Sequence, residues 1–247
     1  MPALPTIADT LNLELTVSYW DVDCDGLMLL PAVFKVLQEA AIKHADQLDA
    51  GARAMVTRGE TWVLNRLAAQ IRRYPRYEEH VRVETWSSGI RGFKGFRDYR
   101  IHSGAELIAS ASSLWLYVAL QTRSLIRVPD AVVDAFPSRA GAVFHPELDK
   151  LKLAPPDPPA PHRTAVSVRH SDIDGNRHVN NTAYLDYLQT ALARAGLPPR
   201  PAQLAIQFLK EIPPESAAVD VCLAPRDGGT AFSVGAGGEL FAQGRVS

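Results

Sequence analysis

The sequence predicts an α+β protein made of two related units in tandem, each with an antiparallel sheet wrapped around one long helix. Three observations lead to this prediction. The chain repeats itself, each copy has one amphipathic helix followed by several separate strands, and a proline-rich stretch divides the copies. Strands that follow a single long helix are typical of an antiparallel sheet that packs on that helix.

The internal repeat is visible as matched residues at a nearly constant spacing. Asp172 and Asp174 lie 151 positions after Asp21 and Asp23. Later pairs keep the same order while the spacing falls to 138 and then 133: Leu37/Leu188, Gln38/Gln189, Ala40/Ala191, Pro75/Pro213, Val81/Val219, Gly104/Gly237, Glu106/Glu239 and Leu107/Leu240. The spacing changes only between expected elements, so the pairs indicate a duplicated unit with shortened loops.

Each unit is expected to have the same order of elements. A strand of alternating residues opens it, at 13–17 and at 164–168, and a polar loop follows. A helix comes next, predicted by apolar residues at helical spacing: Val33, Phe34, Leu37 and Ala41 in one copy, and Tyr184, Leu185, Leu188 and Leu192 in the other. Further strands are expected at 62–71, 81–87, 93–102, 107–118, 203–209, 218–223, 231–234 and 240–246.

A proline-rich linker is expected between the units. Residues 155–161 read PPDPPAP. Proline fixes φ and has no N–H donor, so this stretch cannot form a central strand or the interior of a helix. We therefore expect an N-terminal unit at 8–138, a linker at 139–161 and a C-terminal unit at 162–247. The first unit is longer, and its segment Ile42 to Thr61 is expected to be a long loop.

The composition excludes several classes of protein. The 247 residues are 47% hydrophobic and 21% charged, which is typical of a globular chain with a packed core. A formal net charge of −1 argues against a nucleic-acid binder. Two cysteines cannot build a disulfide framework, and no secretory signal or membrane span is recognisable, so a cytoplasmic location is predicted.

The loop before the second predicted helix concentrates polar side chains. Asp174, Asn176 and His178 lie within it, and Asn181 is the expected N-cap of the helix. The free N–H groups of a helix N-terminus can stabilise an oxyanion, and histidine can act as a general base at neutral pH. The first copy has Leu27 in place of His178, so one catalytic site is expected for the two units.

Metal and serine chemistry are not expected. The first copy opens like a calcium loop at Asp21, Asp23 and Asp25, but its twelfth position is Ala32, where a bidentate glutamate is needed. The sequence has no zinc-ligand pattern and no G-x-S-x-G motif. We therefore predict neither a metal site nor a cofactor.

Over nearly its whole length the chain resembles the acyl-acyl-carrier-protein (acyl-ACP) thioesterases. The stretches that carry the resemblance are WVLNR at 62–66, RYP at 73–75, ETW at 84–86, ASSLW at 111–115, RVP at 127–129 and DIDGNRHVNN at 172–181. The resemblance implies two tandem hot-dog units and hydrolysis of a fatty acyl thioester by activated water. It places the catalytic residues on Asp174, Asn176, His178 and Glu211. Several plant members have a cysteine directly after that glutamate, but here the residue is Ile212, so a covalent cysteine mechanism is not expected.

In the mechanism that these residues suggest, His178 and Glu211 hold and deprotonate a water molecule. Asn176 and the first amides of the helix position the thioester carbonyl, and Asn180 and Asn181 contribute to substrate binding. Asp174 orients either the imidazole or the water.

The resemblance also implies an acyl pocket in the first unit and an acidic carrier protein as partner. The pocket residues are expected to be Phe34, Leu37, Met55, Trp62 and Leu64, although plain core packing explains each of them as well. Residues 66–100 are locally basic, and the expected carrier-binding residues are Arg72, Arg73, Arg76 and Lys94, the alternative being a solvated strand face. A homodimer is one possible assembly.

Two other functions stay open at this point. One is an acyl-CoA thioesterase or hydratase of the same fold, and the other is a non-catalytic acyl-binding module. A binding module could dispense with His178 and Glu211, which this chain retains.

Overall fold

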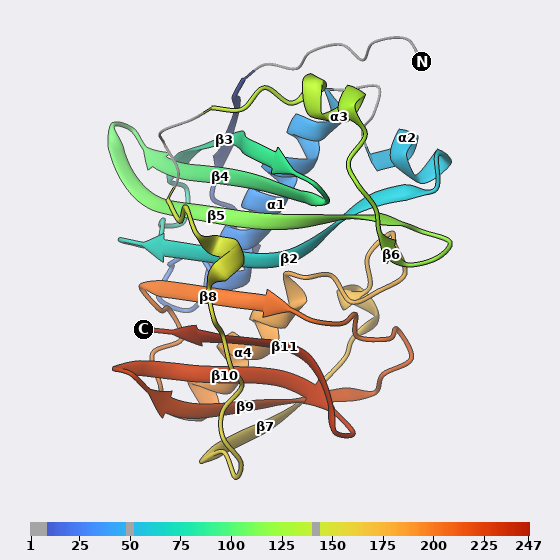
Figure 1. Cartoon of the computed structure of the whole chain (residues 1–247). Helices are drawn as coiled ribbons and strands as arrows, with labels where there is room; N and C mark the ends of the chain where they lie inside the picture. Colours follow the sequence, from blue (N-terminus) through green and yellow to red (C-terminus); the bar gives the residue numbers. More distant parts are fainter. Residues whose placement is uncertain (1–8, 48–51, 140–143) are drawn as a thin grey trace.

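A computed structural model describes residues 9–47, 52–139 and 144–247, and Figure 1 shows one continuous antiparallel sheet through both halves of the chain. The strands are β1 (Leu11–Thr16), β2 (Glu60–Ile71), β3 (His80–Arg91), β4 (Lys94–Ser103), β5 (Glu106–Ala119), β6 (Ser124–Leu125), β7 (His162–Ser167), β8 (Gln203–Phe208), β9 (Ala218–Arg226), β10 (Gly229–Ala236) and β11 (Glu239–Val246). The helices are α1 (Leu30–Asp46), α2 (Ala52–Thr57), α3 (Asp130–Ala135) and α4 (Ala183–Arg194), with 3₁₀ turns η1 (Tyr19–Asp21), η2 (Leu148–Lys150) and η3 (His170–Asp172).

The order of the strands reflects the duplication. It runs β1-β3-β4-β5-β2 in the first half and β8-β11-β10-β9-β7 in the second, with the short β6 paired to β5. The halves join through β2 and β8, where Arg66 lies opposite Gln207 and Gln70 opposite Gln203. The first strand of each half, β1 or β7, therefore lies at an outer edge of the common sheet.

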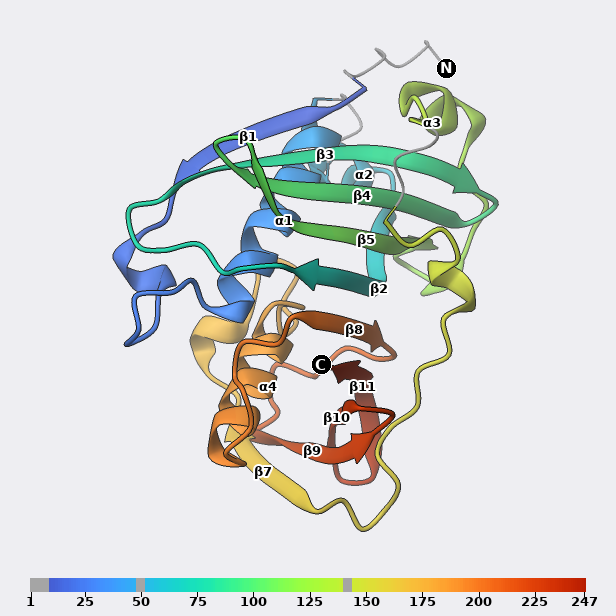
Figure 2. The same cartoon turned by 90° about the vertical axis from the view of Figure 1, so that its left-hand side faces the viewer.

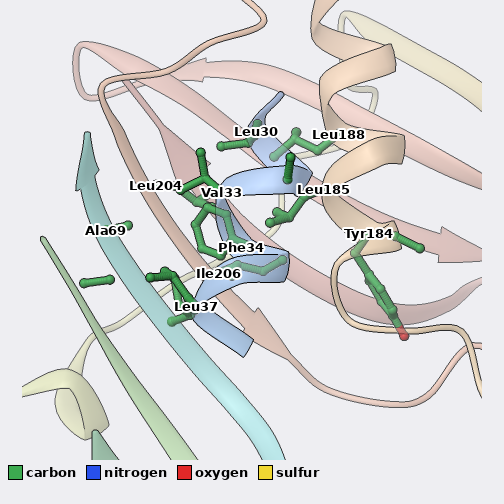
Figure 3. Packing of buried hydrophobic residues seen from close by; sticks show 14 of the residues in the cluster. Leu30, Val33, Phe34, Leu37, Ala69, Tyr184, Leu185, Leu188, Leu204 and Ile206 are labelled. Atoms are coloured by element: carbon green, nitrogen blue, oxygen red, sulfur yellow. The ribbon is translucent and has the colours of Figure 1, made fainter. Parts of the chain in front are cut away.

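Both long helices lie on the same side of the sheet, as Figure 2 shows. Pro31 is in the first turn of α1, where its missing N–H costs nothing, and α4 is followed by Gly196 at φ +71°. Leu37 and Leu188 occupy matching positions in the two helices and are 2% and 0% exposed. Figure 3 shows residues of α1 and α4 packed with Leu204 and Ile206 of the sheet. The two halves thus share one hydrophobic core.

The opposite face of the sheet is crossed by residues 144–161, which we call the strap (Figure 1). Leu148 of the strap is buried against Leu114 of β5 and Ala205 of β8, so it covers the joint between the halves. Arg66 of β2 donates hydrogen bonds from Nη1 to the backbone carbonyls of Leu148, Asp149 and Leu151 at 2.8–3.0 Å.

The predicted antiparallel α+β architecture is confirmed, and each expected strand is present, most with one to four further residues. The matched turns also agree, because Gly104 and Gly237 join equivalent hairpins. The expected loop from Ile42 to Thr61 is wrong in part, since α1 continues to Asp46, α2 covers Ala52–Thr57 and β2 begins at Glu60. Residues 48–51 of that segment lie outside the described residues. The predicted unit boundaries remain a proposal.

Candidate active site

The polar loop before α4 is a tight turn that the first half also forms. The Asp174 carboxylate accepts a hydrogen bond from the Asn176 backbone N–H at 2.8 Å, and the Asp174 N–H donates to the His178 carbonyl at 2.9 Å. In the first half, Asp23 accepts from the Asp25 N–H and donates to the Leu27 carbonyl, both at 2.9 Å. The turn is therefore a property of the repeated unit, and the histidine is what distinguishes the second copy.

Asp172 anchors the start of this loop. The carboxylate is 4% exposed, and it accepts hydrogen bonds from the Arg169 side chain, the Arg169 backbone and the Tyr187 hydroxyl. Burial alone would raise the pKa of Asp172, but the hydrogen bonds from Arg169 and Tyr187 outweigh it and the pKa lies below its ordinary value. Asp172 thus remains charged and holds the loop against α4.

Asn180 arranges the N-terminus of α4. Its side-chain oxygen accepts hydrogen bonds from the Thr182 backbone N–H at 2.9 Å and from the Thr182 hydroxyl at 2.8 Å. The helix begins at Ala183 with Thr182 as its N-cap, so the expectation that Asn181 is the N-cap is wrong. The helix therefore begins one residue later than expected, and Asn181 lines the pocket described below.

His178 and Glu211 are brought together from two segments of the second half. His178 Nε2 lies 3.1 Å from Glu211 Oε2, and the two side chains are 31% and 43% exposed. Arg123, in the turn between β5 and β6 of the first half, places Nη1 3.7 Å from the same oxygen. Solvent therefore reaches an imidazole–carboxylate pair, as a pair that activates water requires.

Tyr184 of α4 positions Glu211, a role that the sequence did not predict. Its hydroxyl donates to the Lys210 carbonyl at 3.2 Å and accepts from the Ile212 N–H at 3.1 Å, so it holds the residues on either side of Glu211. Burial raises the pKa of Tyr184 and keeps the phenol protonated. The sequence shows Tyr184 only as one of the apolar residues of the helix. It does not indicate which backbone groups the hydroxyl contacts.

Asp174 and Asn176 are in the same loop but make no described contact with the His178 side chain. The second carboxylate oxygen of Asp174 accepts from the Asn180 side-chain amide at 3.3 Å, and Asn176 is exposed. Among the described contacts, Asp174 therefore holds the loop rather than the imidazole.

A small apolar pocket of about 20 Å³ lies beside the N-terminus of α4, between the two long helices and the sheet. Phe34, Leu37 and Leu64 from the predicted set line it, together with Asn181. Figure 3 shows Phe34 and Leu37 beside Leu185 of α4 and Ile206 of β8. Other predicted pocket residues, Met55 and Trp62, are instead in a separate buried cluster with Tyr117, Val132 and Phe136.

The predicted carrier-binding residues are not brought together. His178 lies at the end of the sheet where β8 ends and β2 begins, which we call the His178 end. Arg72, Arg73 and Arg76 lie at the opposite end, where β2 runs into the loop before β3. Lys94 is at the start of β4, on the His178 side, but its amine is 3.0 Å from Asp149 of the strap. Four residues in one segment of sequence thus occupy two ends of the molecule.

The opposite end, which we call the Arg200 end, carries the corresponding loop of the first half. Arg200 forms ion pairs there with Asp23 and Asp25, and hydrogen bonding to Asp25 is the main cause that raises the pKa of Arg200. The repeat aligns Leu27 with His178 and Arg73 with Glu211. Both partners of the His178–Glu211 pair are therefore replaced at this end.

The part of the chain that the structure describes has neither a cluster of metal-ligating side chains nor a helix that could span a membrane. Within residues 9–47, 52–139 and 144–247, no three His, Cys, Asp or Glu side chains are grouped so that they could hold a metal ion. No helix in the described part of the chain has the length and apolar character that a membrane crossing requires.

Comparison with known families gives a match in both halves. Residues 9–136 match the model of the acyl-ACP thioesterase N-terminal domain, and residues 157–230 match that of the C-terminal domain. The chain is 28% identical over 196 residues to an oleoyl-acyl carrier protein thioesterase of Coriandrum sativum, covering 73% of this chain and 53% of the relative. It is 29% identical over 192 residues to a palmitoyl-acyl carrier protein thioesterase of Cuphea hookeriana, covering 71% and 45%. The chain spans about half of the length of these relatives.

Solved structures share the whole fold. A 12:0-ACP thioesterase from Umbellularia californica matches with a TM-score of 0.82 at 21% identity, covering 97% of each chain. An acyl-ACP thioesterase from Bacteroides thetaiotaomicron matches with a TM-score of 0.81 at 18% identity, covering 96% of this chain and 97% of that one. The predicted fold of two tandem hot-dog units is thereby confirmed.

Proposed function

Because the chain belongs to the acyl-ACP thioesterase family, we propose that it hydrolyses fatty acyl-ACP thioesters to a free fatty acid and the holo carrier protein. The observation that carries the proposal is the pair of His178 and Glu211, 3.1 Å apart and open to solvent, with an apolar pocket beside the same helix N-terminus. A water-activating pair next to an apolar pocket suits hydrolysis of a thioester whose acyl group is apolar.

In the proposed reaction, Glu211 and His178 bind a water molecule and remove a proton from it. The water oxygen bonds to the thioester carbonyl carbon, and the carbonyl oxygen takes up negative charge. The first amides of α4 and the Asn176 side-chain amide stabilise this charge. When the C–S bond breaks, protonated His178 returns its proton to the leaving thiolate, so the products are a carboxylic acid and a thiol.

We assign Asp174 to positioning. Its carboxylate already accepts hydrogen bonds from the Asn176 N–H and the Asn180 side chain, and Asp23 forms the same turn in the half that lacks the histidine. In this proposal, neither the imidazole nor the water is its direct partner; it maintains the turn that presents His178 and Asn176.

We place the docking of the acidic carrier protein at the His178 end. The cations nearest to the catalytic pair along the chain or in space are Arg123, Arg177 and Lys210, and all three are largely exposed. Arg72, Arg73 and Arg76 are at the other end of the sheet, which argues against a direct role in docking. A cytoplasmic location and a homodimer remain predictions.

The decisive experiment measures released free acid from a panel of acyl-ACP substrates. His178→Ala and Glu211→Gln should each lower kcat by about 10²–10⁴-fold, the range for loss of general acid–base catalysis. Matched controls are His162→Ala and Glu215→Gln, which remove an exposed residue of the same type outside the pair. Circular dichroism verifies that the variants fold.

The outcomes also separate the other functions. Acyl-CoA substrates of matched chain length show whether the enzyme needs the carrier protein, and hydration of an enoyl thioester identifies a hydratase. A His178→Ala variant that retains a near-normal rate of acyl-ACP hydrolysis would contradict the catalytic assignment. Binding of acyl-ACP without any turnover would indicate a binding module.

A further inference from the structure

Three exposed aromatic side chains, Tyr19, Trp20 and Tyr77, lie at the Arg200 end, and we call them the aromatic patch. Tyr19 and Trp20 are in η1 and are 74% and 80% exposed, and Tyr77, in the loop between β2 and β3, is 45% exposed. The rings of Tyr19 and Tyr77 meet edge to face, with their centroids 5.7 Å apart. The Tyr77 N–H donates to the Gly26 carbonyl at 3.0 Å, so the two loops lie side by side (Figure 2).

The fold does not require aromatic residues at these positions. The repeat aligns the aromatic patch with three residues of the second half: His170, Ser171 and Glu215. All three are polar and exposed, and the second half still forms the matching 3₁₀ turn η3. Tyrosine and tryptophan are the residue types that supply most of the binding energy in protein interfaces. Their presence on the surface of the first half therefore indicates an interface.

Charges of both signs border the aromatic patch. Arg76 and Glu78 flank Tyr77 and are exposed, and Asp21 follows Trp20. The pKa of Tyr77 is raised, mainly by the charge of Glu78, so this carboxylate lies near the phenol. The two acidic residues would repel an anionic lipid surface or an acidic protein. A second copy of this chain suits the patch better, because two-fold symmetry can place each Arg76 opposite the Glu78 of the other copy.

We propose that the aromatic patch is the interface of a homodimer, in which two copies of this chain meet through their Arg200 ends. The aromatic side chains form the centre of the interface, and Arg76 and Glu78 form ion pairs between the copies at its rim. Two-fold symmetry closes the contact, so association stops at the dimer. Both His178 ends face outward. The inference goes beyond the proposed function, because it concerns the end of the sheet that lacks the catalytic pair.

Sedimentation velocity of the full chain over a range of concentrations tests this interface. Wild type should reach twice the mass of one chain. Trp20→Ser and Tyr19→His introduce the residues that the second half has at the matching positions, and each should raise the dissociation constant of the dimer by about tenfold or more. Leu125→Ser is the matched control, because Leu125 is 49% exposed but lies in β6 at the His178 end. Its dissociation constant should equal that of wild type.

Charge reversal tests whether the rims of the two copies are complementary. Arg76→Glu leaves two acidic side chains beside Tyr77, and Glu78→Arg leaves two basic ones. Either variant alone should be largely monomeric at a concentration where wild type is dimeric. An equimolar mixture of the two variants should form a heterodimer, because each acidic rim then faces a basic one. A mixture that stays monomeric would contradict the two-fold arrangement.

Two further outcomes would overturn the proposal. One is a wild-type chain that stays monomeric at every concentration, and the other is a dimer that neither Trp20→Ser nor Tyr19→His weakens. Flotation with vesicles of phosphatidylcholine and phosphatidylserine tests the lipid alternative: binding that Trp20→Ser abolishes, without any dimer, would identify a membrane surface instead. None of these measurements requires turnover, so the interface can be established or rejected whether or not the chain hydrolyses acyl-ACP.

Discussion

Arg177 adopts a backbone conformation that is unfavourable for its residue type. Its φ is +65°, in the left-handed region, and the matching residue in the first half is Gly26 at φ +70°. A side chain in this region costs about 1–2 kcal/mol, whereas glycine adopts it freely. The first half therefore has the residue that suits the turn, and the half with the catalytic pair has an exposed arginine instead. Strain retained beside a reactive pair points to a role for the side chain.

Replacing Arg177 with glycine should improve stability and impair substrate docking. We expect Arg177→Gly to raise the free energy of unfolding by about 0.5–1 kcal/mol, since the strain is relieved but the unfolded chain becomes more flexible. The KM for acyl-ACP should rise severalfold at low ionic strength and return toward the wild-type value in salt. Urea denaturation and steady-state kinetics at two salt concentrations measure the two effects.

Asp227→Gly provides the control for this prediction. Asp227 also has a positive φ, +48°, but it lies in the turn between β9 and β10, away from the His178 end. The Asp227→Gly variant should have a higher free energy of unfolding than wild type and an unchanged KM for acyl-ACP. If Arg177→Gly leaves KM unchanged at low salt, Arg177 does not contribute to docking.

At the scale of single residues, the sequence identified the local part of the site better than the long-range part. Asp174, Asn176 and His178 lie within one short loop, and their close spacing alone indicates that they belong to one site. Glu211 was found only through the family resemblance, because the chain leaves α4 and passes through β8 before it returns. Tyr184 and Arg123 reach Glu211 through tertiary contacts that no local pattern encodes.

At the scale of elements, the connection between β2 and β3 is fixed by a cluster of charges. Arg73 pairs with Glu79 and with Glu106, which lies at the start of β5, both at 2.8 Å. Its hydrogen bonds hold the pKa of Glu79 at about 2, well below the ordinary value. These residues join three strands at the Arg200 end, so the cluster is structural, and Arg73 is not free to bind a carrier protein.

Because Glu79 is charged in the folded chain, the free energy of unfolding should depend on pH at acidic pH. Because its pKa is lower in the folded chain, the stabilisation is present above the ordinary pKa of about 4.5 and is lost as the pH falls toward 2. We expect Glu79→Gln to lower the free energy of unfolding at pH 7 by about 1–2 kcal/mol, after allowing for solvent screening. The difference from wild type should shrink between pH 4.5 and pH 2 in urea titrations. A difference that stays constant down to pH 2 would show that Glu79 does not act through its charge.

The elements that were predicted well are those with a clear period. Alternation in β1 and β7 and helical spacing in α1 and α4 predicted elements of the correct type, because one face of each packs against the core. The ends were less accurate, and α2 and α3 were missed, since short helices carry too few turns to show a period. The split of the predicted pocket residues has a related cause: Met55 and Trp62 pack under α3, which the sequence did not reveal.

At the scale of the whole molecule, the two units share one core. The cluster around α1 and α4 includes Leu37 and Val83 from the first half and Leu188 and Val221 from the second. The repeat predicted two units, but it did not show which strands would join them. The sequences of β2 and β8 lie far apart and have no feature that distinguishes them from the other strands. Their pairing, with the strap across the opposite face, makes separate unfolding of either half unfavourable.

A shared core predicts that the halves unfold together, and the chain provides convenient probes for this. All 4 tryptophans, at positions 20, 62, 86 and 115, are in the first half, so their fluorescence reports on that half alone. Far-ultraviolet circular dichroism reports on both halves. We expect the two signals to give coincident urea transitions with a single midpoint.

A substitution in the second half then tests the coupling directly. Leu188 of α4 is 0% exposed, so Leu188→Ala should lower the free energy of unfolding by about 2–5 kcal/mol. The tryptophan transition, recorded in the other half, should shift by the same amount as the dichroism transition. Leu209→Ala is the control, because Leu209 is 40% exposed and its loss should shift neither curve appreciably. If Leu188→Ala shifts the dichroism curve and leaves the tryptophan curve in place, the halves unfold as separate domains and the core between α1 and α4 does not couple them.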